Sequence, residues 1–290
     1  MEMNLMNQKT IIKEFSVTGI GLHSGIDVSM TVKPADVNTG IVFRRADLSP
    51  AVDIKVTPSS IKEAVMCTLL TKDGDQSLSV STIEHLMSAF AMFEIDNVLI
   101  EVNAPELPVM DGSSFEFTQI LIDVGIAEQS VARKGIKIIK PVRVEHEDKF
   151  AEVLPSEKLV YEFKIEWEHP VIAATNDHIV FEYDLDEYIK KVSKARTFGF
   201  YEQLEYLHQN NLAKGASLDN AVGISNEGVL NEGGLRYEDE FVRHKLLDAI
   251  GDFYVGGNIL GHFNCYKSGH TLNNKLLHAI FADKDAWESI

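Results

Sequence analysis

A histidine and two aspartates recur at four-residue spacing in the run LRYEDEFVRHKLLDAIGD, which covers residues 235–252. At about 100° per residue, His244 and Asp248 lie one helical turn apart on one face, and Asp252 continues the same polar stripe. An imidazole and a carboxylate in this arrangement can bind one divalent cation, while Asp252 remains free to hold a neighbouring side chain. The spacing taken alone is more often found on a solvated helix face. Further ligands therefore have to come from elsewhere in the chain.

A glutamate and a histidine stand next to each other in STIEHLMSAF, residues 81–90. This segment has the Ser-x-x-Glu spacing of a capping box, which predicts that Glu84 and His85 lie in the first turn of a helix. In one interpretation Glu84 only caps this helix and His85 packs in the core. In the other, Glu84 is a general base and His85 is a metal ligand within reach of one water molecule. The second interpretation requires His244 and Asp248 to lie nearby in the folded chain.

Two more histidines occupy glycine-rich loops. His23 lies in TGIGLHSG, residues 18–25, which predicts an exposed histidine at the tip of a hairpin. A histidine in such a loop is more often a plain surface residue, so His23 is a weak site candidate. His270 lies in KSGHTLNNKLL, residues 267–277, directly before the final predicted helix, where a catalytic group would be accessible.

Hydrophobic periodicity predicts an α+β chain. Helices are expected at residues 114–124, at 184–195, and from about Asp239 to shortly before Gly256. Strands are expected at residues 10–17, 26–32, 40–43, 51–56, 64–71, 98–102, 142–145, 150–154, 160–167, 178–183 and 262–266. A short basic linker at 132–135 separates two such blocks. We therefore expect two α+β domains, residues 1–131 and 132–290, although no internal sequence repeat is visible.

Composition excludes several classes of protein. The net charge of −17 argues against nucleic acid or an anionic membrane as the main partner. Cys67 and Cys265 are the only cysteines, so neither a disulfide framework nor a thiolate zinc site is expected. No signal peptide or transmembrane segment is evident, which favours a soluble cytoplasmic protein. One local cluster of cations either complements a helix C-terminus or steers a phosphate-bearing substrate: Lys190, Lys191, Lys194 and Arg196.

Six blocks of sequence together resemble one known family. They are GLHSG, TIEHLMSA, LPVMDGSS, ARTFGF, GLRYEDEFVRHKLLDAIGD and YKSGHTLNNKLL, in that order and spanning nearly the whole chain. They are similar to the UDP-3-O-acyl-N-acetylglucosamine deacetylases of lipid A biosynthesis in Gram-negative bacteria. The resemblance implies a zinc-dependent amidohydrolase, with Fe²⁺ as a possible alternative metal, that acts on an acylated UDP-sugar. It also implies two domains of related βααβ topology, with helices sandwiched between two sheets and the active site at the domain junction.

The resemblance also implies a role for each candidate residue. The expected metal ligands are His85, His244 and Asp248. The expected catalytic groups are Glu84 as general base, His270 as general acid, Thr197 at the oxyanion and Asp252 as the partner of His270. Substrate contacts are expected from Lys245, Phe198, Lys149 and His23, and an apolar passage for the acyl chain is expected between residues 198 and 224. The pair Gly215-Ala216 departs from the Gly-Gly often found in the family, which puts the local loop geometry in doubt.

Two other functions fit part of the same pattern. Two histidines and one carboxylate also describe the facial triad of non-haem Fe(II) oxygenases. A glutamate directly preceding a ligand and a His-Asp pair suit hydrolysis better. A carbohydrate-nucleotide binding protein with a vestigial site is the second alternative, and the intact set of candidate ligands disfavours it.

Overall fold

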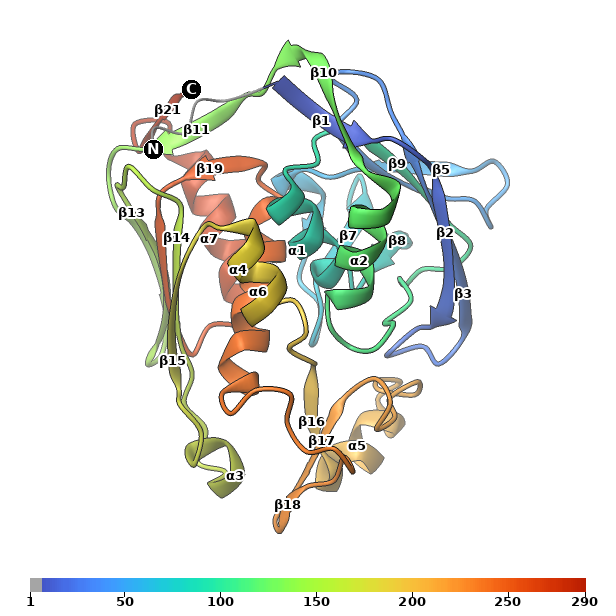
Figure 1. The fold of residues 1–290 in the computed structure, drawn as a ribbon, viewed down its shortest axis with the longest axis vertical. Coiled ribbons are helices and arrows are strands. Elements are labelled where there is room, and N and C mark those ends of the chain that lie inside the picture. The colour runs from blue at the N-terminus through green and yellow to red at the C-terminus, as the bar shows by residue number, and fades with distance from the viewer. Residues whose placement is uncertain (1–6) are drawn as a thin grey trace.

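Two five-stranded sheets form the outer layers of the molecule, and helices fill the space between them (Figure 1). The computed structural model describes residues 7–290, so the first six residues of the predicted first domain lie outside the described residues. The structure confirms an α+β fold.

The two large sheets have the same strand order. The first has the order β2-β3-β9-β4-β5 and the second β12-β13-β20-β14-β15, so each runs first, second, fifth, third, fourth along the chain. In each sheet one central pair is parallel and the other pairs are antiparallel. The first sheet comprises β2 (Phe15–Ile20), β3 (Asp27–Pro34), β4 (Ile41–Arg45), β5 (Val52–Lys55) and β9 (Val98–Val102). The second comprises β12 (Val142–His146), β13 (Lys149–Leu154), β14 (Val160–Lys164), β15 (His178–Glu182) and β20 (His262–Tyr266).

Five helices lie between the large sheets: α1 (Glu84–Phe93), α2 (Phe115–Val124), α4 (Leu185–Lys191), α6 (Glu240–Tyr254) and α7 (His270–Ala282). Helix α6 is buried on almost every side, because it packs against α1, α7 and the second sheet. Its polar stripe is therefore inside the protein together with its apolar residues, such as Leu246 and Ile250. No helix within residues 7–290 is long and apolar enough to cross a membrane.

Smaller sheets and turns complete the structure. Antiparallel strands β6 (Ile61–Lys62), β7 (Leu69–Lys72) and β8 (Asp75–Ser81) form one small sheet, and β1 (Asn7–Ile11) pairs with β10 (Ile126–Ala132). Strand β11 (Gly135–Ile138) lies between β19 (Asn258–Leu260) and β21 (Trp287–Ser289). The remaining elements are η1 (Pro58–Ser60), α3 (Pro170–Ala173), η2 (Tyr201–Gln203), α5 (Leu204–Gln209) and a sheet of β16 (Phe198–Phe200), β17 (Val222–Ser225) and β18 (Gly228–Val229).

Several expectations from the sequence need correction. The capping box before α1 is wrong: Ile83 is the N-cap residue, and Ser81 belongs to β8 and donates to the carbonyl of Pro105. The carboxylate of Glu84 instead accepts from the backbone N–H of Thr68. The expected strand at 64–71 begins only at residue 69, and the helix expected at 184–195 ends at residue 191. Before β7, the backbone of Thr68 bonds to the side chain of Glu84 and to the N–H of Thr82 instead of to a neighbouring strand.

Arg133, a buried cation, lies in the connection between β10 and β11 that joins the first half of the chain to the second. Its guanidinium lies 2.8 Å from the carboxylate of Glu94 and 3.0 Å from that of Asp96. It also donates to the side chain of Asn258, the first residue of β19, at 2.6 Å. Arg133 therefore links two carboxylates of the first half to a residue of β19 in the second half.

Helices α1 and α6 cross without a side chain between them at Gly251. A Cβ atom placed there would lie 2.0 Å from the carbonyl oxygen of Glu84 and 3.0 Å from the backbone nitrogen of Ser88. Helix propensity favours alanine over glycine by about 1 kcal/mol, but a clash with backbone atoms cannot be relieved by a side-chain rotation. The crossing therefore requires glycine.

We predict that Gly251→Ala lowers the free energy of unfolding by about 3 kcal/mol, because α1 has to move away from α6. Chemical denaturation measures the change. Gly233→Ala is the matched control, since a Cβ atom at Gly233 meets nothing within 4 Å. Equal stability of the two variants would contradict the close crossing.

Candidate active site

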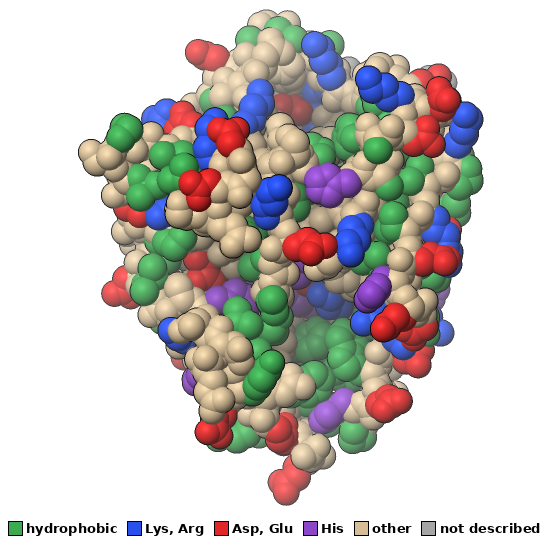
Figure 2. All heavy atoms as spheres, turned by 180° about the vertical axis from the view of Figure 1, so that it is seen from behind, with side chains coloured by type: hydrophobic (Ala, Val, Ile, Leu, Met, Phe, Trp, Pro, Cys, Tyr) green, Lys and Arg blue, Asp and Glu red, His purple; other side chains and the backbone are tan. Residues whose placement is uncertain are grey.

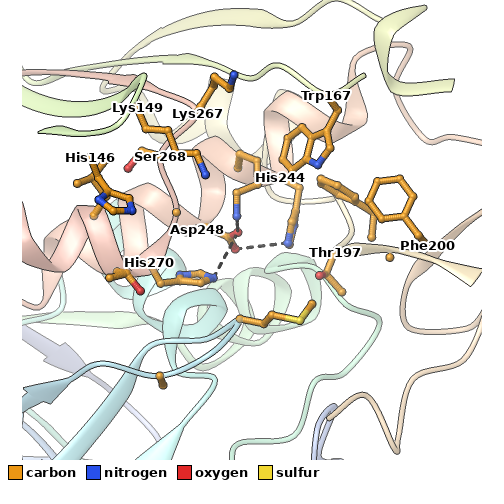
Figure 3. Close-up of a pocket in the computed structure, with 18 of the residues that line it drawn as sticks. His146, Lys149, Trp167, Thr197, Phe200, His244, Asp248, Lys267, Ser268 and His270 are labelled. Carbon is orange, nitrogen blue, oxygen red and sulfur yellow. Dashed lines mark hydrogen bonds and ion pairs between the residues drawn. The ribbon is translucent and has the colours of Figure 1, made fainter. Parts of the chain in front are cut away.

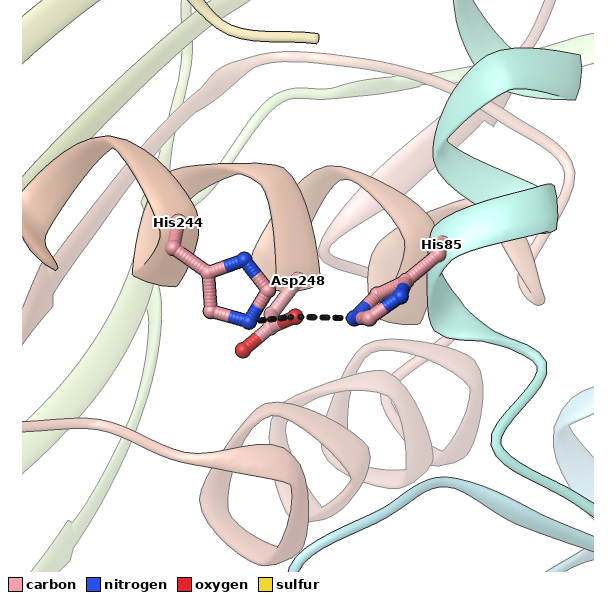
Figure 4. Close-up of side chains that lie close together, drawn as sticks. All are labelled: His85, His244 and Asp248. Carbon is pink, nitrogen blue, oxygen red and sulfur yellow. Dashed lines mark ion pairs between the residues drawn. The ribbon is translucent and has the colours of Figure 1, made fainter. Parts of the chain in front are cut away.

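Three side chains from the two crossing helices converge on one point (Figure 4). His244 and Asp248 project from α6, and His85 projects from the first turn of α1. The Nε2 atoms of His85 and His244 lie 3.5 Å and 3.4 Å from Oδ1 of Asp248. One potential ligand atom from each residue falls within 4.8 Å of the other two, and all three side chains are buried. The structure thus brings together the three residues that the sequence predicted as ligands.

The hydrogen bonds around this cluster leave its inner atoms free. Nδ1 of His244 lies 3.0 Å from the carbonyl oxygen of Ala195, so Nδ1 carries the proton and the lone pair of Nε2 points into the cluster. Oδ2 of Asp248 accepts from Nζ of Lys245 at 2.7 Å. Oδ1 of Asp248 is buried and has no hydrogen-bond partner within the described residues. Two imidazole nitrogens and one orphaned carboxylate oxygen fit the donor set of a divalent transition metal.

The electrostatics keep these donors in the protonation states that a metal requires. Burial lowers the pKa of His244 to about 3, so its imidazole is neutral. Burial by itself opposes the ionisation of Asp248, but the adjacent ammonium group of Lys245 holds the pKa of this carboxylate well below its usual range. Both donors are therefore unprotonated at neutral pH.

A second group of titratable side chains lies beside the cluster. Nδ1 of His270, the first residue of α7, lies 2.9 Å from Oδ2 of Asp252. Its Nε2 atom lies 3.7 Å from Oε1 of Glu84 and 3.9 Å from Oδ2 of Asp248. Burial opposes the charge of His270, but Asp252 and Glu84 raise its pKa to about 9. Burial raises the pKa of Glu84. The pair therefore combines a protonated imidazole with a carboxylate of increased basicity.

One cavity adjoins this group, and a second cavity shares a wall with the first. The first has a volume of about 440 Å³; its lining includes Lys149 and His270, both labelled in Figure 3, and Lys245. The second, of about 180 Å³, extends between β16, α5 and β17 and is lined mainly by apolar side chains. Both are lined by Met66, Thr197, Phe198, Gly199, Phe200 and Leu207. Seen from behind, the molecule has a hollow of hydrophobic side chains between the α3 segment and β16–β18, with histidine and cationic side chains near its edge (Figure 2).

Thr197 lies where the cavities join, and its backbone is fixed on both sides. Its N–H donates to the carbonyl of Gly112 at 2.8 Å, and its carbonyl accepts from the N–H of Val222 at 2.7 Å. Gly112 has a φ of +81°, and a Cβ atom there would lie 1.9 Å from the carbonyl oxygen of Asn220. This explains the glycine in the LPVMDGSS turn: it allows a close approach that holds Thr197 at the site.

His23 is not the exposed hairpin residue that the sequence predicted. It is buried: its backbone N–H donates to Glu106 at 2.8 Å, and its Nδ1 atom accepts from the backbone N–H of Ala213 at 3.4 Å. Burial lowers the pKa of His23. The side chain lines the second cavity, so a loop that looked solvated is closed by a segment about 190 residues further along the chain.

The cation cluster at 190–196 does not line either cavity. Arg196 pairs with the buried carboxylate of Glu240 at 2.9 Å, and two of the lysines pair with Glu187. The structure therefore favours a structural role for this cluster. Sequence reasoning missed other residues that line the first cavity, because nothing in their local sequence marks them: Met66, His146, Trp167, Lys267, Ser268 and Lys275.

We predict that His85→Ala and His244→Ala each weaken the binding of one zinc ion per chain by at least about 100-fold. Loss of a residue that merely orients a ligand already costs 10- to 100-fold in affinity. Metal analysis after dialysis against a competing chelator measures this. His262→Ala is the control, because His262 pairs with Glu162 on the second sheet and takes no part in the cluster. Full zinc occupancy in both ligand variants would remove these residues from the metal site.

Comparison with known proteins agrees with this geometry. A family model described as UDP-3-O-acyl N-acetylglycosamine deacetylase, LpxC, matches residues 8–282. A UDP-3-O-acyl-N-acetylglucosamine deacetylase of Francisella tularensis is 88% identical over 286 residues, which cover 99% of this chain and 100% of that protein. Proteins of the same name from Shewanella frigidimarina and Idiomarina loihiensis are 51% and 49% identical, over 98% and 99% of this chain and 92% and 93% of theirs. The chain therefore belongs to the family of UDP-3-O-acyl-N-acetylglucosamine deacetylases.

Proposed function

We propose that this protein hydrolyses the N-acetyl amide of UDP-3-O-acyl-N-acetylglucosamine to acetate and a free amine, an early committed step of lipid A biosynthesis. The observation that carries the proposal is the buried His85–His244–Asp248 cluster beside the Glu84–His270 pair, at the wall of the first cavity. Family membership supports the substrate. A cytoplasmic location fits a nucleotide-sugar substrate and two buried free thiols, Cys67 and Cys265.

Zinc is the metal that we propose for the three-residue cluster, and the same donors also suit Fe²⁺. When bound there, zinc lowers the pKa of a water molecule and polarises the acetyl carbonyl. Lys245 holds the outer oxygen of Asp248, so the inner oxygen remains available as the third ligand. A hydrogen bond from a neighbouring residue, such as this one, fixes the orientation of a carboxylate that binds a metal.

The acid–base steps then fall to the chain's own residues. Glu84 accepts a proton from the attacking water, since burial makes its carboxylate more basic than usual. The hydroxyl of Thr197 donates to the oxygen on which negative charge develops. Protonated His270 donates from Nε2 to the departing amine, while Asp252 holds its Nδ1 atom. An Fe(II) oxygenase has no need of this carboxylate–imidazolium pair, which is why hydrolysis is the better assignment.

Substrate binding divides between the two cavities. Lys149 and Lys245 line the first cavity, where cationic groups attract the diphosphate of a UDP-sugar in an otherwise acidic protein. Phe198 lines both cavities, and His23 lines the second. The apolar second cavity occupies the segment in which the acyl passage was expected, residues 198–224, so we assign the acyl chain to it.

We infer that the chain comprises two domains, residues 1–131 and 132–290, of related βααβ topology. The identical strand order of the two large sheets supports this division, and so does the short connection from β10 to β11. Each proposed domain supplies part of the site: Glu84 and His85 from the first, and His244, Asp248 and His270 from the second.

We predict a bell-shaped dependence of kcat/KM on pH. Activity rises as Glu84 loses its proton, at a pH above the usual range for a glutamate, and falls as His270 loses its proton near pH 9. Glu84→Gln and His270→Gln should each reduce kcat by about 10²- to 10⁴-fold and remove the acidic and the alkaline limb respectively.

His278→Gln is the control for that experiment, because His278 is exposed on the same helix as His270. It should keep the wild-type profile. Unchanged rates and profiles in both the Glu84 and His270 variants would remove these residues from the mechanism.

We predict that shortening the acyl chain by four methylenes lowers kcat/KM by on the order of 200-fold if those methylenes are fully buried, at about 0.8 kcal/mol each. Ala221→Phe, which fills the second cavity, should penalise long chains more than short ones. Ala127→Phe on β10 is the matched control outside the cavity. A flat dependence on chain length, with no effect of the Ala221 substitution, would contradict the acyl passage.

A further inference from the structure

Thr68 is a buried residue that bonds to Glu84, the proposed base, and to Asp252, the partner of the proposed acid His270. It directly precedes β7 in the small β6-β7-β8 sheet, and its hydroxyl reaches Asp252 on α6. Nothing in the local sequence, VMCTLLT, distinguishes this threonine from Thr71, three residues later.

Three hydrogen bonds fix Thr68. Its carbonyl accepts from the N–H of Thr82 at 3.1 Å, which ties it to the turn before α1. Its own N–H donates to Oε2 of Glu84 at 3.1 Å. Its hydroxyl donates to Oδ1 of Asp252 at 2.5 Å, across 184 residues of sequence. One residue of the first half therefore connects the carboxylate of Glu84 to a carboxylate of the second half.

Thr68 binds one oxygen of each carboxylate, and both carboxylates also face His270. Nδ1 of His270 lies within hydrogen-bond distance of both oxygens of Asp252, at 3.2 Å from Oδ1 and 2.9 Å from Oδ2. With Oε2 of Glu84 engaged by Thr68, Oε1 is the oxygen that faces Nε2 of His270, at 3.7 Å. With Oδ1 of Asp252 engaged by Thr68, Oδ2 accepts from Nδ2 of Asn273 at 2.8 Å and lies 2.9 Å from Nδ1 of His270. The imidazole of His270 is thereby set relative to Glu84 through two intermediate residues, Thr68 and Asp252.

We propose that Thr68 is a positioning residue that fixes the placement of His270, through Asp252, relative to Glu84. The inference rests on the proposed acid–base roles of Glu84 and His270. Misplacement of a catalytic group by about 1 Å can cost 100-fold in rate, so a hydrogen bond that sets this placement affects turnover more than substrate binding.

Thr68→Val tests the proposal because it removes the hydroxyl, keeps the side-chain shape and leaves the backbone N–H to Glu84 intact. The expected result is a fall in kcat of about 10- to 100-fold with KM changed less than twofold. Thr68→Ser, which retains the hydroxyl, should restore kcat to within about threefold of wild type. Thr71→Val is the matched control: Thr71 is a buried threonine three residues later, in β7, whose hydroxyl lies 3.4 Å from the carbonyl of Ser60 and bonds to neither Glu84 nor Asp252.

Two readouts do not depend on turnover. Zinc content should remain at one per chain in Thr68→Val, since the substitution does not touch the proposed ligands. The downfield ¹H NMR signal of the Nδ1 proton of His270 should shift or broaden in Thr68→Val and stay in place in Thr71→Val. Wild-type kcat together with an unmoved signal in Thr68→Val would overturn the proposal. If Thr68→Val does not fold, Thr68→Ala takes its place with the same criteria.

The result separates this inference from the proposed function. If Glu84→Gln and His270→Gln lose activity while Thr68→Val does not, Thr68 has no positioning role and the acid–base assignment stands. If Glu84→Gln and His270→Gln retain wild-type activity, the acid–base assignment falls and the positioning role falls with it. In the double variant Asp252→Ala/Thr68→Val, kcat should be within twofold of Asp252→Ala alone, because Thr68 acts through Asp252. If the losses in kcat of the two single variants add fully in the double variant, Thr68 does not act through Asp252.

Discussion

The close crossing of α1 and α6 is the constraint on which the site depends. Gly251 allows the carbonyl of Glu84 to approach α6 to a distance that any side chain would prevent. Glu84 and the next residue, His85, are carried by that same turn of α1, so a proposed base and a proposed ligand are placed together. The facing stripe of α6 supplies His244, Asp248 and Asp252. Any displacement of one helix would therefore separate the ligands and the acid–base groups at once.

The same crossing forces charged groups into the interior, where an unpaired charge costs several kcal/mol. Asp252 is stabilised by bonds from Thr68, Asn273 and His270. Asp248 differs, because Lys245 satisfies only one of its oxygens. The contrast is informative: the fully partnered carboxylate is suited to hold a neighbour, and the partly partnered one is suited to bind a cation.

The two cavities differ in character and offer different surfaces to the parts of a substrate. His244, Asp248 and His270 line the first cavity, which shares a wall with the apolar second cavity, and Thr197 is part of both walls. Its position depends on contacts from Gly112 in one proposed domain and Val222 in the other. A substrate with a charged nucleotide, a sugar amide and an acyl chain matches this succession of polar, reactive and apolar surfaces.

The sequence by itself determined the chemistry. The 3.6-residue period places His244, Asp248 and Asp252 on one face of a helix wherever that helix lies, and family motifs identified the other candidates without any coordinates. Local patterns also located α2 and α6, and the start of α7, to within about a residue or two, because glycines and polar residues mark these ends.

Only the tertiary structure decided which of these residues meet, and how. Several features depend on contacts between segments that are far apart in the chain. They are the burial of His23, the absence of a capping box at Glu84, the place of Trp167 and Lys267 in the cavity wall, and the bond from Thr68 to Asp252. Local sequence carries no signal for such contacts, because the residues next to a threonine, a histidine or a lysine do not show whether its side chain lies on the surface or in a site. Packing of the helices between the two sheets brings these segments together, and packing is a property of the whole chain.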